Sequence, residues 1–504
     1  MSILSSTTPH ARREAPLLSV AILNHNGARI LDVVRRSVQA VLAQDHPAIE
    51  LLIVDDNSSD GSDETLAALC DEVGATFVST RDGAHGICAA RNRAIERARG
   101  EYLAFLDNDA VPQPGWAAAL VRFLEEHPDL GACASRVMFA DRPDVVNSMG
   151  SMLNELFHGN GVGIHELVEY AECPEEVMYA TGNGMTLRRR AVEEVGPFDE
   201  GLLFYTPDDA DYGMRLRRAG WRIAPAPDAV VHHMHSFSKT IQGMSFWDGR
   251  NRVRLALKHL SWRELPRFVV EDVRYHAAFT RLRDYARCWW STLTDLQGVR
   301  GLAAYRWAHR GEPGYRQAFS PWFEAPRRLM VVPDNRPYGR EMLPLATLRA
   351  GEGDEAHLYH GWYWPEAHRG TRLRWARQVA SLVGALPQGA VALHWDLVAA
   401  PAAGDVSLTI RVQRREAAAA DGIDDGAGGD AAWVDVASLS GRLTDRADGG
   451  PAAVDTPCDL PPGEYRLILA ADAAPVERGY FPRQISFGLA GLRVVSGSAA
   501  EGEE

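Results

Sequence analysis

Three short apolar runs near the start of the chain each end in a cluster of Asp and Asn side chains. The runs span residues 17–23, 49–54 and 102–106, and segments with helical spacing of apolar residues separate them. Strands that alternate with helices form right-handed βαβ units in a mainly parallel sheet. Ligands of such sheets bind beyond the carboxyl ends of the strands. The sequence therefore predicts an α/β domain with a polar site at that edge.

The run 102–106 ends in Asp107-Asn108-Asp109. Two Asp side chains at positions i and i+2 of an extended backbone point to the same side. There they can share one hard divalent cation through oxygen ligands, with a phosphate completing the coordination. The alternative is a strand that merely ends in a polar turn, where Asp and Asn are common. The surrounding motifs decide between the two interpretations.

The turn after the first run argues against two common nucleotide-binding folds. It reads Asn24-His25-Asn26-Gly27, whereas a dinucleotide-binding domain requires G-x-G-x-x-G there, and the chain also lacks a P-loop. The net charge of −14 argues against general affinity for nucleic acid.

Four motifs in a fixed order resemble family-2 glycosyltransferases with the GT-A fold. They are Asn-x-Asn-Gly at 24–27, Asp-Asp-Asn-Ser-Ser-Asp-Gly-Ser at 55–62, Ala-Ala-Arg-Asn-Arg-Ala at 89–94 and Gly-Glu-Tyr-Leu-Ala-Phe-Leu-Asp-Asn-Asp at 100–109. The chain is most similar to the rhamnosyltransferase-like members, which build bacterial surface polysaccharides. The resemblance covers about residues 17–240 and implies an inverting enzyme that uses a nucleotide-sugar donor.

The resemblance implies donor-binding roles for side chains on the first three motifs. Asp56 would bind the imide N–H of the nucleobase, and Asn24 and Asn26 would flank the nucleotide. Arg91 would face the donor diphosphate or position the acids that follow it. Two plain alternatives stay open from the residues alone. Residues 55–60 could form a turn that caps the next helix, and Arg91 could be a solvated helix residue.

The resemblance also implies a metal site for Mn²⁺ or Mg²⁺. Asp107 and Asp109 would bracket the ribose, metal and diphosphate, and one His of the run Val-Val-His-His-Met-His-Ser at 230–236 would complete the metal shell. His233 aligns best and His235 is next, since neutral imidazole is a good ligand for Mn²⁺-like ions. These residues could instead be surface histidines.

A turn of small residues at 179–187 contains Gly182 and Asn183, and the family places this loop near the donor sugar and diphosphate. Glycine permits close approach of backbone to a ligand.

Asp208 and Asp209 open a helix that the sequence predicts to run to about Ala219. Direct displacement of a nucleoside diphosphate requires a group that takes the proton of the acceptor hydroxyl. The family has an acidic pair here, usually Glu-Asp, whose second member is the base, so Asp209 is the predicted base. Asp208 would support it or bind the acceptor hydroxyl, and Asp211 is a third candidate. A plain helix start, with Thr206 as N-cap and Pro207 as the first helical residue, explains the same acids.

The remainder of the chain predicts further parts. A helical segment at 241–310 is basic, and residues 245–310 hold 13 Lys and Arg against 6 Asp and Glu. It could lie on an anionic membrane, bind an anionic acceptor, or pack as a bundle against the sheet.

After a linker at 311–339, short alternating strands at 340–497 predict a β-sandwich. This region resembles an accessory domain of polysaccharide glycosyltransferases. Its Trp residues could stack on sugars or form a core. Residues 1–16 are expected to be disordered and 498–504 form an acidic tail.

These observations predict an inverting transferase that moves a sugar from a UDP- or dTDP-linked donor to a saccharide or lipid-linked saccharide acceptor. Six dispersed Cys, no signal peptide and no long apolar run favour the cytoplasm, with peripheral contact to the inner face of the membrane as an option. Two alternatives are a sugar-1-phosphate nucleotidyltransferase, whose Gly-rich loop is not seen, and a non-catalytic carbohydrate-binding or scaffold protein.

Overall fold

The structure is a computed structural model, which describes residues 15–83, 85–203, 207–234, 244–279, 282–323, 342–350, 352, 354, 357–362, 366–368, 370–400, 406–416, 432–443, 450–472, 476–478 and 483–496. The chain divides into two compact units. The first contains Met1–Val137, Met149–Ser151 and Pro174–Ser320, and the second contains Met138–Ser148, Met152–Cys173 and Pro321–Glu504.

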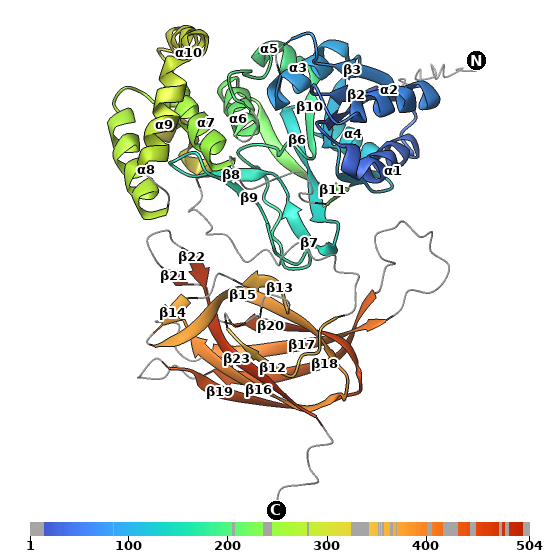
Figure 1. Ribbon diagram of the computed structural model, residues 1–504, viewed down its shortest axis with the longest axis vertical. Helices are drawn as coiled ribbons and strands as arrows, with labels where there is room; N and C mark the ends of the chain where they lie inside the picture. The colour runs from blue at the N-terminus through green and yellow to red at the C-terminus, as the bar shows by residue number, and fades with distance from the viewer. Residues whose placement is uncertain are drawn as a thin grey trace, which may run out of the picture. The chain divides into compact units, whose positions relative to one another are not determined.

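The first unit is built on a mixed sheet with the strand order β3-β2-β1-β4-β10-β6-β11-β5 (Figure 1). Strands β1 to β4 run parallel, with β1 at the centre of the four, while β10 runs antiparallel to both β4 and β6. The strands are β1 (Leu18–Asn24), β2 (Ile49–Asp55), β3 (Thr76–Ser79), β4 (Tyr102–Asp107), β5 (Ala110–Pro112), β6 (Leu130–Phe139), β10 (Met185–Arg188) and β11 (Arg222–His233). The predicted α/β fold with a mainly parallel half is confirmed.

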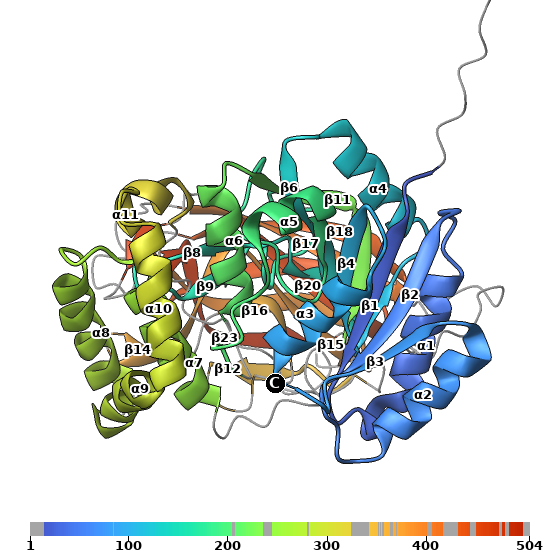
Figure 2. The same cartoon turned by 90° about the horizontal axis from the view of Figure 1, so that it is seen from above.

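Helices cover both faces of this sheet. They are α1 (Leu31–Leu42, preceded by the 3-10 turn η1 at Ala28–Ile30), α2 (Ser62–Val73), α3 (Ile87–Arg97), α4 (Trp116–Glu126), α5 (Arg189–Val195) and α6 (Asp208–Arg218). Helices α1, α2 and α4 share one apolar cluster with Ala104 and Leu106 of β4. Phe105 points to the opposite face, because side chains alternate along a strand, and there Arg91 of α3 lies over its ring. Figure 2 shows α1 and α2 on one side of β1 and α3 on the other.

The start of α6 differs from the prediction. The helix begins at Asp208, and Pro207 occupies the N-cap position instead of the first helical position. Thr206 lies outside the described residues. Asp208, Asp209 and Asp211 all fall in the first turn, where the partial positive charge of the helix N-terminus favours carboxylates.

The basic segment forms a helical bundle within the first unit. Its helices are α7 (Met244–His259), α8 (Leu265–Phe279), α9 (Leu282–Thr294) and α10 (Leu296–Ala308), followed by α11 (Tyr315–Phe319) and the 3-10 turn η2 (Ser320–Trp322) in the stretch predicted as a linker. Arg252 of α7 is buried and pairs with Asp272 at 2.6 Å, and Arg254 pairs with Asp199 at 2.8 Å. Two basic side chains of α7 therefore form ion pairs inside the protein. This favours a helical bundle packed within the unit over a helix that presents its basic face to a membrane. Among the described residues, no helix has both the length and the apolar character needed to cross a bilayer.

The second unit is rich in β-structure. Its main sheet has the strand order β18-β17-β20-β15-β23-β16-β19. An added Cβ on Gly441 of β18 would meet Val454 of β19 at 2.6 Å, so the two end strands of this order lie against each other. The apolar core of the unit includes Trp362 and Trp395. The strands are β12 (Thr347–Arg349), β13 (Leu358–Trp362), β14 (Glu366–His368), β15 (Thr371–Leu386), β16 (Ala390–Ala399), β17 (Val406–Glu416), β18 (Ala432–Leu443), β19 (Ala452–Leu460), β20 (Gly463–Ala471), β21 (Val476–Arg478), β22 (Arg483–Ile485) and β23 (Phe487–Val495).

Near the end of β6 the chain leaves the first unit and forms an excursion, Met138–Ser148 and Met152–Cys173, which belongs to the second unit. The excursion includes β7 (Arg142–Ser148) and β9 (Gly159–Gly161), and β9 pairs with β8 (Ser151–Leu153). Its residues Phe139, Val145 and Leu167 share an apolar cluster with Tyr359, Val383 and Ile468. The sequence analysis did not predict this discontinuous arrangement.

Candidate active site

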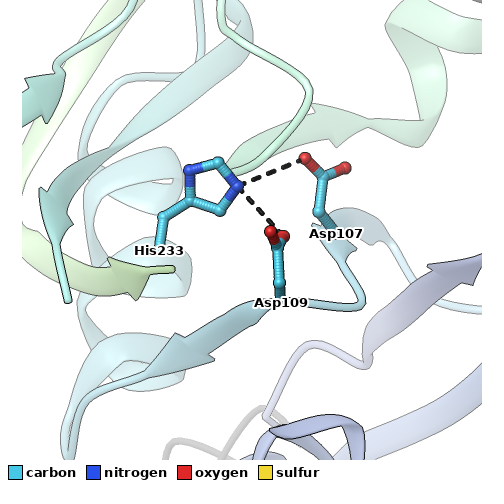
Figure 3. Close-up of side chains that lie close together, drawn as sticks. All are labelled: Asp107, Asp109 and His233. Atoms are coloured by element: carbon cyan, nitrogen blue, oxygen red, sulfur yellow. Dashed lines mark ion pairs between the residues drawn. The ribbon is translucent and has the colours of Figure 1, made fainter. Parts of the chain in front are cut away.

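Asp107, Asp109 and His233 come together at the carboxyl end of β4 (Figure 3). The chain turns from β4 into β5, and antiparallel pairing sets His233 of β11 opposite Ala110 of β5. His233 Nε2 therefore lies 3.0 Å from Asp109 Oδ1 and 3.7 Å from Asp107 Oδ2. Asp109 and His233 are buried, while Asp107 is partly exposed.

This triad can hold a divalent metal ion. One ligand atom from each residue lies within 4.8 Å of the others. Two carboxylate oxygens and one imidazole nitrogen suit Mn²⁺, and the carboxylates alone suit Mg²⁺. His235, the second predicted histidine ligand, lies outside the described residues.

Asn24 ties the ends of the central strands together. Its buried amide donates to Asp55 Oδ1 at 2.8 Å and accepts from Asn108 Nδ2 at 2.9 Å. It also donates to Ser58 and Ser62 of the following turn. Asn24 thus fixes the relative positions of the β1, β2 and β4 termini, and its predicted place beside the nucleotide stays a prediction.

Asp56 and Asn26 lie at the same edge of the sheet. Asp56 accepts hydrogen bonds from Thr80 Oγ1 at 3.0 Å and from the Gly86 N–H at 2.9 Å. A carboxylate has about four acceptor sites, so Asp56 keeps capacity for a further donor such as a base N–H. Asn26 is exposed in the left-handed region, with φ of 50°, and its Oδ1 accepts from the Ser59 N–H at 2.9 Å.

Arg91 is not the solvated residue of the plain alternative. Its guanidinium is buried over the rings of Phe105 and Phe198 and donates to Asp208 through Nη1. An added Cβ on Gly182 would fall 1.9 Å from Arg91 Nη2, so any larger residue there requires the Arg91 guanidinium to shift. The Gly182 backbone thus lies directly against the guanidinium that pairs with Asp208.

The turn containing Gly182 and Asn183 connects the two groups of acids. Asn183 Nδ2 lies 3.3 Å from Nδ1 of His233, and the Gly182 N–H donates to Asp209 Oδ2 at 3.3 Å. One short turn thus contacts both the triad of Asp107, Asp109 and His233 and the acidic pair of α6. These residues lie in four separate segments of the chain, yet they meet at one edge of the sheet.

Burial raises the pKa of the Asp209 carboxyl above its ordinary value, while the positive charge of Arg91 and the N–H groups of Gly182 and Ala210 oppose this shift. The Ala210 N–H donates to Asp209 Oδ1 at 2.9 Å. A carboxylate whose pKa moves upward towards neutrality is a stronger base. Asp208 differs in that Arg91 engages it directly.

Several residues that hold the site in place were not predicted from the sequence. Asp55 accepts from Asn24 and from Ser58, and Asn108 bridges β4 to β1. Phe198 supports Arg91 and stacks on Tyr212 of α6 with ring centroids 4.0 Å apart. Asp55 and Asn108 stand inside the motifs and could have been read there, but no sequence signal marks Phe198.

The fold and the comparison with protein families identify a glycosyltransferase domain. Residues 19–196 match the family model described as Glycosyl transferase family 2. The chain therefore contains a family 2 glycosyltransferase domain, and its mixed sheet is the GT-A-like fold that the motifs predict.

Curated relatives match the same region. The chain is 28% identical over 229 residues to a glucosyl-dolichyl phosphate glucuronosyltransferase of Haloferax volcanii, covering 43% of this chain and 70% of that protein. It is 31% identical over 211 residues to the O-antigen biosynthesis protein RfbC of Myxococcus xanthus, covering 40% of this chain and 16% of that protein. It is 27% identical over 217 residues to a pre-mycofactocin glycosyltransferase of Mycobacterium tuberculosis, covering 42% and 43% respectively. The chain thus spans most of the first relative but less than half of the other two.

Solved structures with some likeness include the mannosyltransferase PcManGT of Pyrobaculum calidifontis in complex with GDP-Man and Mn²⁺. The identity is 18% and the TM-score 0.36, with 61% of this chain and 84% of that chain covered. GalNAc-T7 with UDP, GalNAc and Mn²⁺ has 13% identity and a TM-score of 0.44, with 74% and 71% covered. The fold assignment rests on the sheet order and the family match.

Proposed function

We propose that this chain transfers a sugar from a UDP- or dTDP-linked donor to a saccharide acceptor, with inversion at the anomeric carbon, as a step in bacterial surface polysaccharide synthesis. The observation that carries the proposal is the turn at Gly182 and Asn183, which contacts both the triad around His233 and the acid Asp209. A transferase of this kind needs a leaving-group site and a base side by side. Relatives named for O-antigen biosynthesis and for glucuronosyl transfer support the substrate class.

The donor would bind along the carboxyl ends of β1, β2 and β4. Asp56 would accept the imide N–H of the base, and the exposed Asn26 would flank the nucleotide. Asp107, Asp109 and His233 would hold Mn²⁺ or Mg²⁺. When bound, the ion neutralises negative charge that develops on the departing diphosphate.

Asp209 would remove the proton from the acceptor hydroxyl as that oxygen bonds to the anomeric carbon. Its raised pKa suits this task, because a base works best when its pKa lies near the operating pH. Asp208, which Arg91 holds in place, would orient the acceptor hydroxyl. Displacement in one step, with base and leaving group on opposite faces of the sugar, inverts the configuration.

The acceptor is proposed to be a saccharide or a lipid-linked saccharide, and the protein is proposed to act in the cytoplasm, in peripheral contact with the membrane. Trp262, Trp290 and Trp307 of the helical bundle are strongly exposed, and Trp is enriched at membrane interfaces. Arg306 and Arg310 lie over Trp262 and Trp307 at 4.1 Å and 4.5 Å. All six cysteines are free, which is compatible with a reducing compartment.

Release of nucleoside diphosphate from a panel of nucleotide sugars, with an oligosaccharide acceptor, tests the proposal. Turnover is expected with UDP- or dTDP-sugars in Mn²⁺ or Mg²⁺ and should disappear in EDTA. His233→Ala should lose most of this activity, whereas His232→Ala is the matched control, since its side chain leaves the opposite face of β11. Full turnover in EDTA, or an equal loss in both variants, would exclude the metal site.

A separate experiment with anionic vesicles tests the proposed membrane contact. If the contact exists, the protein should co-sediment with the vesicles.

A further inference from the structure

Asp211 stands in the first turn of α6, and the proposed mechanism does not use it. Its side chain is fully buried, and both of its carboxylate oxygens are engaged. Oδ1 pairs with Lys258 Nζ at 2.8 Å and lies 2.8 Å from His259 Nε2. Oδ2 accepts from Arg215 Nε, one turn further along the same helix, at 2.9 Å. Two residues of α7 therefore contact the helix that carries Asp209 (Figure 1).

The charges around Asp211 keep its carboxylate ionised. Burial alone would raise its pKa, but Lys258, Arg215 and His259 hold this pKa well below its usual value. Burial lowers the pKa of His259 to about 4, so the imidazole is neutral near pH 7. Its Nδ1 has no hydrogen-bond partner among the residues that the structure describes, so we place the ring proton on Nε2, which then donates to Asp211. A carboxylate with so low a pKa is a weak base, and Asp211 is better suited to holding α6 in place.

Asp209 and Asp211 face different neighbours, because they lie two residues apart in an α-helix. A helix of about 3.6 residues per turn places two such side chains about 200° apart around its axis. Asp209 accepts from the Gly182 N–H on one side, while Asp211 meets the last turn of α7 on the other. The rotation and the position of the first turn of α6 therefore depend on contacts at both sides.

The last turn of α7 is itself fixed by neighbouring segments. Lys258, whose side chain is only 5% exposed, also pairs with Asp199, between α5 and α6, at 2.9 Å. From α10, Arg306 donates to the carbonyl oxygens of Leu257 and Leu260 at 2.6 Å and 2.7 Å. The end of α7 is therefore held firmly enough to fix the helix that it contacts.

We propose that Lys258 and His259 are positioning residues of the transferase, which hold Asp209 at the acceptor through their contacts with Asp211. This inference rests on the proposed function, in which Asp209 is the general base. A base acts only within hydrogen-bond reach of the proton that it removes, and a misplacement of about 1 Å can lower the rate about a hundredfold. The helical bundle thereby takes part in the reaction without touching the substrate.

Asp211→Asn tests the proposal, because it keeps the size of the side chain and removes the charge that Lys258 binds. We expect kcat to fall about tenfold or more, with little change in the KM for the donor or in the affinity for UDP with Mn²⁺. Those two quantities depend on the proposed metal site of Asp107, Asp109 and His233, none of which lies on α6.

Asp272→Asn is the matched control. Asp272 of α8 is also a fully buried carboxylate, and it pairs with Arg252 of α7 at 2.6 Å. Each variant takes an acceptor from a buried cation, so both should melt at a lower temperature than the wild type. When both are assayed below their melting transitions, only Asp211→Asn should lose kcat. An unchanged kcat in Asp211→Asn, or an equal loss in the two variants, would overturn the proposal.

Hydrogen exchange provides a readout that does not need turnover. Amide hydrogens exchange faster where a segment opens more often, so residues 208–214 should exchange faster in Asp211→Asn than in the wild type or in Asp272→Asn. If the wild type turns over no nucleotide sugar, the proposed function fails, and the exchange still shows whether α7 holds α6. Unchanged exchange at 208–214 in Asp211→Asn would overturn the positioning role even in an active enzyme.

His259 offers a pair of milder variants should Asp211→Asn fail to fold. His259→Phe keeps a ring against Tyr305, whose ring centroid lies 5.5 Å away, but removes the donor to Asp211. His259→Gln keeps an N–H donor. We expect kcat to be several-fold lower in His259→Phe, at an unchanged KM for the donor, and largely restored in His259→Gln. An equal loss in the two variants would overturn the role of this hydrogen bond.

Discussion

At the scale of single residues, the surroundings of Asp209 determine how readily its carboxylate takes a proton. It stands in the first turn of α6, accepts from the N–H groups of Gly182 and Ala210, and is held in surroundings that raise its pKa. Asp208 precedes it by one residue but is bound by Arg91. Two adjacent carboxylates thus have different environments, and only one is left to take a proton.

We predict that Asp209→Asn lowers kcat by roughly 10²–10⁴-fold, the usual contribution of a general base, with little change in the KM for the donor. In the folded protein the pKa of Asp209 is raised above its unfolded value. Its contribution to stability is therefore full below the unfolded pKa and is lost as pH rises through the folded pKa. At pH 7 the variant should accordingly melt at the same or a higher temperature. Steady-state kinetics and thermal melting of the same preparation check both expectations.

The same shift predicts the acid limb of the pH–rate profile. Activity should fall as the pH drops through the raised pKa, at a higher pH than the ordinary value of about 3.9 for Asp would give. The exposed Asp228, changed to Asn, serves as a control and should keep both turnover and profile. Near-normal turnover of Asp209→Asn would remove this residue from the mechanism.

Residue types and local spacing predicted the acids of the site but not their support. Asp107 and Asp109 were recognisable because two acids two residues apart follow an apolar run. Asp55 and Asn108 stand inside the same motifs, but their contacts with Asn24 span 31 and 84 residues of the chain, which local spacing does not show. The role of Phe198 beneath Arg91 likewise depends on a tertiary contact over more than a hundred residues, which periodicity cannot show.

At the scale of elements, a glycine allows α6 to pack closely against the segment of Met178 and Tyr179, which precedes β10. An added Cβ on Gly213 would lie 2.4 Å from Tyr179 Cβ and 2.8 Å from the Met178 carbonyl oxygen. In a helix interior, alanine is normally more stable than glycine by about 0.5–1 kcal/mol. At this position steric overlap opposes that preference. The Met178 carbonyl oxygen and the Tyr179 Cβ are fixed to the backbone and cannot move away by a change of rotamer.

We therefore predict that Gly213→Ala destabilises the protein by about 1–3 kcal/mol, the usual cost of overpacking. The displaced helix should also carry Asp209 away from Gly182 and lower kcat about tenfold or more, since small misplacements of catalytic groups are costly. Gly301→Ala in α10 is the matched control, because its Cβ would meet no atom within 4 Å. That control should gain stability and keep activity. An equal gain in both variants would show that α6 is free to shift.

The order of elements was predictable because each strand and helix of the first half has its own periodicity. Helices α1, α2 and α3 lie between β1, β2 and β4, where segments with helical spacing separate the three apolar runs. The pattern could not show which of the two units a segment belongs to. The residues of the excursion alternate like any strand-forming segment, and nothing local in them indicates which core they join.

At the scale of the whole molecule, the excursion makes the second unit discontinuous. Besides the apolar cluster of Phe139, Val145 and Leu167 with three residues of the β-rich region, polar contacts also fix it there. Asp144 accepts from Tyr359 Oη at 2.7 Å and from Arg466, and Arg142 donates to the Tyr359 carbonyl at 3.0 Å. A cut after the helical bundle therefore does not separate two independent domains.

We predict that a chain ending at Ser320 folds poorly, although it keeps every residue of the candidate active site. The loss of Tyr359, Val383 and Ile468 would expose three apolar side chains, each of which forfeits about 1.5–3 kcal/mol of burial, and would leave Asp144 without its partners. The shortened chain should bind a hydrophobic dye and aggregate, as measured by fluorescence and light scattering. Val145→Thr with Leu167→Asn should reduce both signals, because these changes make the uncovered surface polar. If the shortened chain stays monomeric and does not increase the fluorescence of the dye, the excursion folds without the β-rich region.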